Sequence, residues 1–200
     1  GAFLEAYTAC HVGPQTGLPV VTLKPADPVS RQCPFVTAAG CRVYENRPAS
    51  CRMYPLARML HRSRQDGSLG ESYALISEPH CRGFEDGVPL TVSQWIADQG
   101  LETYNELNDA MMAVISVKQQ YAPGVLRGEA AKKLFAALYD PDALRIDWHE
   151  RVASDCRRLG LRFDVSDQTD DEPLLRFAMQ YAAELLRHEE SPGAEAGLKS

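Results

Sequence analysis

Four unevenly spaced cysteines place the strongest constraint on how this 200-residue chain can fold. Cys33, Cys41, Cys51 and Cys81 are separated by 7, 9 and 29 residues, and each lies beside residues that form turns or end strands. Side chains from separate segments can converge at such positions, and four thiolates are enough to bind zinc or an iron–sulfur cluster. The spacing differs from a paired C-x2-C knuckle. Spacing alone therefore leaves both a shared metal site and buried structural thiols open.

The segment that carries these cysteines has the pattern of short strands and turns. Three regions of strand are expected: Pro19–Leu23, a hairpin over 33–44 with its turn at 37–40, and a second hairpin over 56–77. The Asp66-Gly67 dipeptide favours the turn of the second hairpin. Between the hairpins, Pro48 suits an early helical position and Pro55 stops the helix, which predicts one or two turns around Cys51.

After Cys81 the apolar residues recur with the period of a helix. The expected helices open at Thr91, as an N-cap, and cover Leu101–Tyr121, Glu129–Tyr139, Trp148–Leu159 and Glu172–His188. We therefore expect an α+β protein. A small β-rich cysteine-cluster module occupies residues 1–90, a helical extension follows over 91–190, and 191–200 form a disordered tail.

Several arginines lie close in the sequence to the candidate ligands. Arg42, Arg47, Arg52 and Arg82 each lie within four residues of one of the four cysteines. A site built from thiolates is negatively charged and is easier to bury beside cations. The alternative interpretation is that these arginines are solvated surface residues.

The run from Cys41 to Pro55 resembles the signature of the YkgJ-type cysteine-cluster proteins. That signature is C-x-[IV]-Y-x-x-R-P-x-x-C-R-x-[YF]-P, preceded by C-P-[FL] and followed by a later cysteine. The chain supplies Cys33-Pro34-Phe35 before it and Cys81 after it. The resemblance covers about residues 18–84 and implies a zinc- or iron-chelating domain. It implies Cys33, Cys41, Cys51 and Cys81 as metal ligands, with an iron–sulfur cluster favoured over zinc.

One departure from the family concerns cysteines upstream of this motif. Members usually carry a cluster resembling C-x-x-C-C or C-x-x-x-C-C, which this chain lacks. The sequence has no initial Met, and Phe3–Tyr7 has the pattern of a helix already under way. We therefore expect an N-terminally truncated chain, in which four ligands are a lower bound.

The remaining cysteines and histidines give weaker signals. We expect Cys10, at the end of the first helix, to be a buried thiol rather than a fifth ligand. His80 is a minor candidate for ligation or for a contact with a ligand. Cys156 falls at helical spacing with Val152 and Leu159, which favours a place in the core.

Three classes of function compete. The first is a metal-binding protein, with a structural zinc-binding interaction domain as a variant. The second is an enzyme that uses the cluster, because flagellin lysine N-methylases share the cysteine-cluster resemblance, yet no S-adenosylmethionine pocket is recognisable. The third is a secreted domain with three disulfides, which the even cysteine count allows and the lack of an export signal disfavours. No catalytic residue is assigned.

The charge distribution and the length of the apolar runs exclude some classes of binding partner for this protein. The formal net charge of −6 divides into +3 up to Arg82 and −9 beyond it, so most of the cysteines lie in the basic part. This balance argues against broad nucleic-acid binding. The longest apolar run, Ala110–Val117, is too short to cross a bilayer. We expect a cytoplasmic protein that binds a metal ion or cluster, with any protein partner unidentified.

Overall fold

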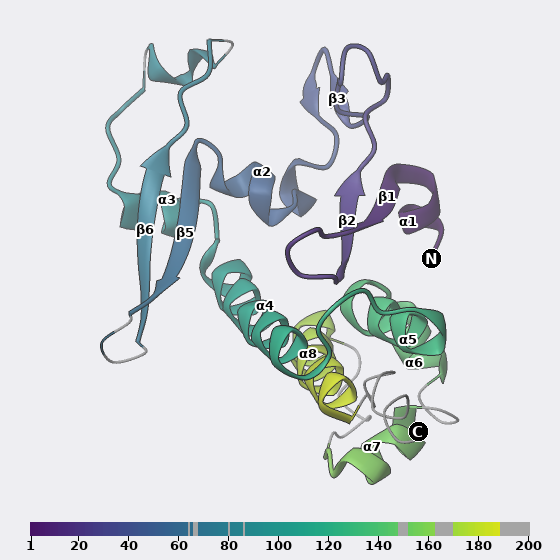
Figure 1. Ribbon diagram of the computed structural model, residues 1–200. Helices are drawn as coiled ribbons and strands as arrows, with labels where there is room; N and C mark the ends of the chain where they lie inside the picture. The colour runs from purple at the N-terminus through teal and green to yellow at the C-terminus, as the bar shows by residue number, and fades with distance from the viewer. Residues whose placement is uncertain are drawn as a thin grey trace, which may run out of the picture. The chain divides into compact units, whose positions relative to one another are not determined.

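The computed structural model describes residues 1–63, 65, 68–79, 81–85, 87–147, 152–162 and 170–188. These ranges contain eight α-helices and three small antiparallel two-stranded sheets (Figure 1), which confirms the expected mixed α+β class. Contacts divide the chain into two compact units. The first unit joins Gly1–Val36 to Leu107–Ser200, and the second is Thr37–Glu106. These units differ in extent from the segments 1–90 and 91–190, so that domain assignment stays a prediction.

The first unit begins with a short helix and a hairpin. Helix α1 (Ala2–Tyr7) leads into strand β1 (Thr8–Val12), which pairs antiparallel with β2 (Pro19–Leu23) from Thr8 opposite Leu23 to Val12 opposite Pro19. The helix and β2 agree with the sequence analysis, whereas β1 was not expected. Leu18, in the loop between the strands, is 1% exposed and belongs to the main hydrophobic core.

Helices complete the first unit. They are α4 (Glu102–Tyr121), α5 (Gly128–Tyr139), α6 (Pro141–Asp147), α7 (Ala153–Leu159) and α8 (Asp171–His188), with the unit boundary inside α4. Helix α8 packs against α5, α6 and α7. Its buried face runs from Leu174 to Leu186 at spacings of three and four residues, as an amphipathic helix requires. The helices expected over the segments of α4, α5 and α8 are confirmed, and so is the described part of the helix expected at Trp148–Leu159. Helix α6 was not expected, and residues 148–151 and the expected tail at 191–200 lie outside the described ranges.

The second unit is built from two hairpins, short helices and turns. The unit boundary lies within strand β3 (Val36–Thr37), which pairs with β4 (Gly40–Cys41). The 3-10 helix η1 (Tyr44–Asn46) and helix α2 (Ala49–Met53) follow. Strand β5 (Leu56–Arg62) pairs antiparallel with β6 (Leu69–Leu75). The 3-10 helix η2 (Arg82–Phe84) and helix α3 (Val92–Asp98) follow. The expected hairpin over 56–77 and helix around Cys51 are confirmed, while Asp66-Gly67 lies outside the described residues.

Buried apolar side chains are distributed very unequally. The main core consists entirely of residues of the first unit. Among the described residues of the second unit, Leu101 is the single hydrophobic side chain that is fully buried, at 0% exposed. The second unit therefore gains little of its stability from a hydrophobic core of its own.

The hairpin expected over 33–44 is much shorter in the structure. Pro34 and Phe35 form a turn in which the Val36 N–H donates to the Cys33 carbonyl oxygen at 3.3 Å, and Tyr44 opens η1. Pro34 has no N–H to contribute to a strand ladder. The strands expected at 33–36 and 41–44 are thus wrong in extent.

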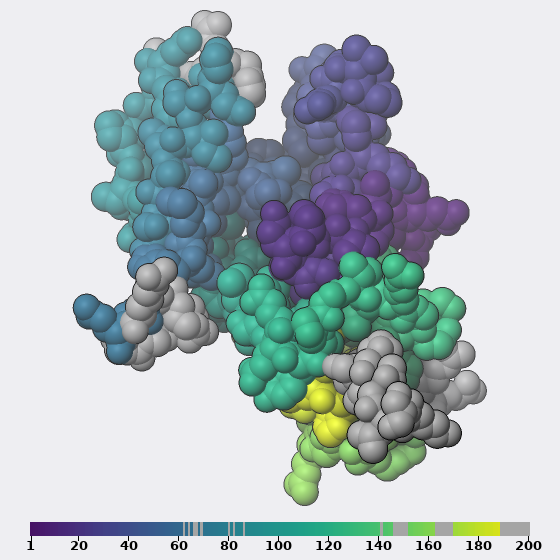
Figure 2. All heavy atoms as spheres, viewed as in Figure 1, coloured from purple at the N-terminus to yellow at the C-terminus, as the bar shows by residue number. Residues whose placement is uncertain are grey.

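No described helix combines the length and the apolar character that a bilayer crossing requires. The longest described helices, α4 and α8, carry charged residues along their length. Figure 2 shows the same view with all heavy atoms drawn as spheres.

Candidate metal centre

Cys33 lies in the first unit, in the segment between β2 and β3, and its side chain is half-buried. This segment is anchored by Phe35, which is 7% exposed. The Phe35 ring lies 6.2 Å from the ring of Phe3 and 5.0 Å from that of Tyr7, measured between centroids. The Cys-Pro-Phe triplet therefore fixes the chain beside Cys33 by aromatic packing on α1.

Cys41, Cys51 and Cys81 lie in the second unit, each in a different local setting. Cys41 ends β4 and is half-buried, Cys51 lies within α2 and is exposed, and Cys81 comes between β6 and η2 and is half-buried. Helix α2 has Pro48 as its N-cap, and the Cys51 N–H donates to the Pro48 carbonyl oxygen at 3.0 Å. Pro48 is thus the N-cap of the turn that carries Cys51, in agreement with its expected place at the beginning of this helix.

Arg52, a residue of the motif, holds this turn within the second unit. Its Nε donates to the Arg47 carbonyl oxygen at 3.0 Å, its Nη1 to the Gln99 carbonyl oxygen at 3.1 Å, and its Nη2 to the carbonyl oxygen of Glu45. The guanidinium also lies 5.2 Å from the centre of the Tyr104 ring. Arg52 therefore joins α2 to the preceding turn and to the end of α3.

Arg47 makes a second connection to the same end of α3. Its Nε donates to the Tyr44 carbonyl oxygen at 2.8 Å, and its Nη2 donates to Gln99 Oε1 at 3.1 Å. Its guanidinium lies 3.7 Å from the centre of the Tyr44 ring. The two motif arginines thus position the backbone around Cys51 through carbonyl acceptors. This role was not foreseen from the sequence, because Gln99 lies far along the chain.

Tyr54 brings a hydroxyl group close to Cys81. The Tyr54 Oη atom is buried and makes no hydrogen bond of ordinary geometry with any described residue. The Cys81 thiol, burial and the Glu78 carboxylate, in that order, raise the pKa of Tyr54, so both side chains are near neighbours of the hydroxyl. A Cβ atom at Gly83 would lie 3.9 Å from Cys81 Sγ. The motif marks Tyr54 as an aromatic position, but no sequence signal indicated Glu78.

The donor set has suitable chemistry for zinc or an iron–sulfur cluster, since all six cysteines are free thiols. Within the ranges that the structure describes, no three Cys, His, Asp or Glu side chains lie close enough to hold a metal ion. Cys33 belongs to the first unit, and the other three candidates belong to the second.

The predictions for the remaining cysteines and for His80 are confirmed in one case, wrong in one, and untested in one. Cys156, in α7, is 6% exposed, and burial raises the pKa of its thiol, which confirms its place in the core. The expectation of a buried Cys10 is wrong. Cys10 is exposed on β1 opposite Val21, because the chain continues from α1 as a strand whose side chains are mostly in contact with solvent. His80 lies outside the described residues.

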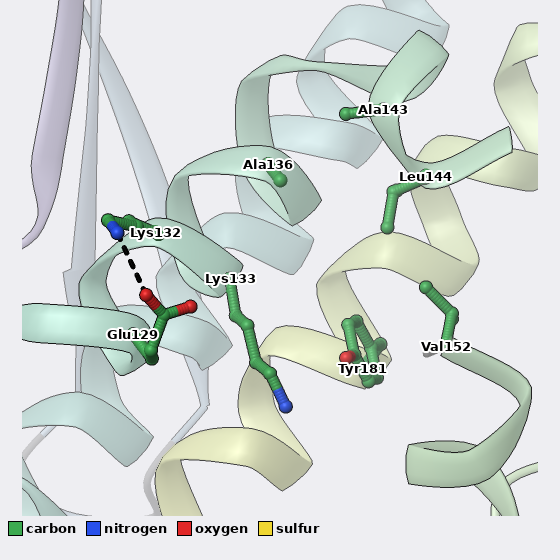
Figure 3. Close-up of a pocket in the computed structure, with 8 residues that line it drawn as sticks. All are labelled: Glu129, Lys132, Lys133, Ala136, Ala143, Leu144, Val152 and Tyr181. Carbon is green, nitrogen blue, oxygen red and sulfur yellow. Dashed lines mark hydrogen bonds and ion pairs between the residues drawn. The ribbon is translucent and has the colours of Figure 1, made fainter. Parts of the chain in front are cut away.

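A cavity of about 180 Å³ lies in the first unit, between side chains of α5, α6 and α8 and Val152 (Figure 3). Two of its polar lining side chains, those of Lys133 and Tyr181, bind the carboxylate of Asp155. Lys133 Nζ and the Tyr181 hydroxyl each donate to Asp155 Oδ2 at 2.8 Å, and Arg158 donates to Asp155 Oδ1 at 3.2 Å. This network connects α5, α7 and α8, and we interpret it as structural.

Comparisons with protein-family models, curated proteins and solved structures return no significant match. The likeness to the YkgJ-type proteins therefore rests on the quoted motif. Metal binding, which that likeness implies, is a proposal for this chain.

Proposed function

We propose that this protein binds metal through the thiolates of Cys33, Cys41, Cys51 and Cys81, which coordinate an iron–sulfur cluster or zinc. The observation that carries the proposal is the motif from Cys41 to Pro55, with Cys33-Pro34-Phe35 before it and Cys81 after it. The iron–sulfur cluster is preferred on the resemblance. As part of this proposal we place the protein in the cytoplasm, where thiols stay reduced.

The distribution of buried side chains supports a stabilising metal. The second unit carries three of the four candidate ligands, yet Leu101 is its single fully buried hydrophobic residue among those described. Small units with so little core usually depend on a metal, a disulfide or a partner for stability. Metal binding to cysteines is commonly coupled to folding. A metal held by these cysteines would therefore contribute to the stability of the second unit.

The accessibility of the thiols also supports the proposal. The four candidate cysteines are exposed or half-buried, whereas Cys156 is buried in the core. Ligands must release a proton and meet the metal during loading, and both events require access from solvent. The candidates are thus distinguished from the core thiol by their surroundings as well as by the motif.

The proposal is tested by metal analysis of protein purified without oxygen. Iron, zinc and acid-labile sulfide are measured per chain, together with the visible absorption spectrum. We expect a stoichiometric metal that is lost or strongly reduced when Cys41, Cys51 or Cys81 is replaced by Ser. Cys33→Ser tests the remaining ligand in the same way.

Two variants provide matched controls. Cys10→Ser removes an exposed thiol outside the motif, and Cys156→Ala removes the buried thiol, so both should retain the metal content of the unaltered chain. Iron together with sulfide identifies a cluster, and zinc alone identifies a mononuclear site. The proposal fails if the unaltered protein contains neither metal, or if the four motif variants retain as much metal as the two controls.

A further inference from the structure

Lys118 is the most deeply buried charged residue that the structure describes, with 1% of its surface exposed. It lies in the last turn of α4. Its Nζ donates to the carbonyl oxygens of Ala122 and Gly124, the latter at 2.6 Å, and these bonds satisfy carbonyls that follow the end of the helix. A lysine ammonium has three N–H donors. One donor is therefore left without an acceptor among the described residues.

The charge of Lys118 also lacks a carboxylate partner within the described part of the chain. Burial lowers the pKa of Lys118, and no charged neighbour offsets this effect. The buried Asp155 contrasts with it, since Lys133 and Arg158 form ion pairs with that carboxylate. Buried charges are costly unless they are paired. Lys118 is thus compensated by carbonyl dipoles alone.

Lys118 lines a cavity of about 460 Å³ within the first unit, a volume typical of small-molecule sites. The cavity lies between the loop that joins β1 to β2 and the chain after α4. These are the adjoining purple and green regions in Figure 2. Of the described residues that line it, Lys118 is the single charged one. Gln15, Thr16 and Gln119 supply polar groups.

The loop between β1 and β2 approaches Lys118 closely. Gly17 has a φ of 67°, and a Cβ atom at this position would lie 2.4 Å from the Gly124 carbonyl oxygen and 3.2 Å from Lys118 Nζ. Glycine is therefore required here on two grounds, backbone conformation and space. Val12 and Val125, which are 49% and 57% exposed, provide apolar surface in the cavity.

We propose that this cavity binds a small organic anion whose carboxylate or phosphate oxygen accepts the remaining N–H of Lys118. The anion supplies the counter-charge that the described residues do not. Its apolar part lies against Val12 and Val125, and the amides of Gln15 and Gln119 are available as further donors. The inference does not depend on the proposed metal site, which involves other residues.

Three ring compounds that differ in charge test the proposal on the full chain. Benzoate and phenyl phosphate carry the two anionic groups, and neutral benzamide has nearly the shape of benzoate. Binding is measured by titration with two-dimensional NMR of the ¹⁵N-labelled protein. We expect at least one anion to bind ten times more tightly than benzamide, with shifts at 15–17, 119 and 124. The ratio between the two anions distinguishes a carboxylate from a phosphate ligand.

Lys118→Met should remove the preference for the anion, whereas Lys132→Met, which removes an exposed lysine of α5, should leave it unchanged. Circular dichroism establishes that both variants are folded. If Lys118→Met does not fold, the proposal is judged by whether the NMR shifts in the unaltered protein occur at 15–17, 119 and 124. Equal binding of anions and benzamide, shifts confined to other regions, or a preference that survives in folded Lys118→Met would overturn the proposal.

Discussion

At the scale of single residues, Asp155 shows how one carboxylate can connect three helices. It is 9% exposed and lies in α7. It accepts hydrogen bonds from Lys133 of α5, from Arg158 of its own helix and from the Tyr181 hydroxyl of α8. Burial alone would raise its pKa, but the hydrogen bonds from these three residues lower the pKa overall. The carboxylate is therefore stabilised in its charged form.

Asp155→Asn should lower the free energy of unfolding by about 1–3 kcal/mol at neutral pH, because the variant leaves Lys133 without its anionic acceptor. The native pKa lies below the ordinary value of 3.8. The stabilisation is hence complete above that pH and is lost as pH falls below it toward the native pKa. Urea unfolding of the unaltered protein and of Asp155→Asn between pH 7 and pH 3 measures the free energy of unfolding of each. The difference between the two free energies should shrink toward pH 3. A constant difference down to pH 3 would contradict the assignment.

At the scale of elements, α3 has a well-defined beginning. The Thr91 hydroxyl accepts from the Gln94 N–H at 3.2 Å, and Gln94 Oε1 accepts from the Thr91 N–H at 2.8 Å, which together form a capping box. The Trp95 Nε1 of the same helix donates to the Met53 carbonyl oxygen at 3.2 Å. The cap therefore defines where α3 begins, and the indole joins α3 to α2 within the second unit.

Thr91→Ala should destabilise α3 by about 1 kcal/mol, the usual value of an N-cap. Hydrogen exchange of the amides at 92–98 reports the loss locally, and exchange there should become roughly five times faster if opening of this helix limits the rate. Ser93→Ala, an exposed substitution within the same helix, is the control and should change exchange little. Equal effects of the two substitutions would show that the cap contributes nothing.

The sequence predicted elements well where local chemistry decides them. Thr91 as N-cap, the strand Pro19–Leu23 and the amphipathic pattern of α8 all depend on near neighbours, and all are present. Cys10 was misplaced because its environment depends on pairing with β2 across a loop. The roles of Arg47 and Arg52 were missed for the same reason, since their acceptor Gln99 is distant in sequence.

In the candidate site, too, the sequence predicted the local features and missed those that depend on residues distant in the chain. The motif identified Cys33, Cys41, Cys51 and Cys81, and their function as ligands stays a prediction. Spacing could not show that Cys33 belongs to a different compact unit from the other three. It also could not show that Tyr54 lies beside Cys81, because burial and proximity arise from tertiary packing. Buried Lys118 gave no signal in the sequence.

At the scale of the whole molecule, the main hydrophobic core lies in one of the two units. That core belongs to the first unit and includes the buried face of α8. The proposed function takes three of its four metal ligands from the second unit and the fourth, Cys33, from the first. If so, removing the metal should affect the two units unequally, since a ligand stabilises the part of the native state that binds it.

Treatment of metal-loaded protein with a chelator should therefore accelerate hydrogen exchange in β5, β6 and α3 by at least tenfold and leave α8 nearly unchanged. The exchange is followed by mass spectrometry of peptides from both units. Addition of the metal should restore protection, which separates reversible loss from damage. Uniform acceleration in both units, or none in the second, would argue against a metal that stabilises the second unit.

The first unit is made of two stretches of chain, with Thr37–Glu106 inserted between them. A ribosome completes the second unit before it reaches the helices that bury Leu18. At about 5–20 residues per second, the hairpin of β1 and β2 waits on the order of ten seconds for α8. During translation, the apolar side chains of this N-terminal hairpin are thus exposed to chaperones and to other nascent chains. The insertion therefore lengthens the time during synthesis for which Leu18 lacks its partners in the core.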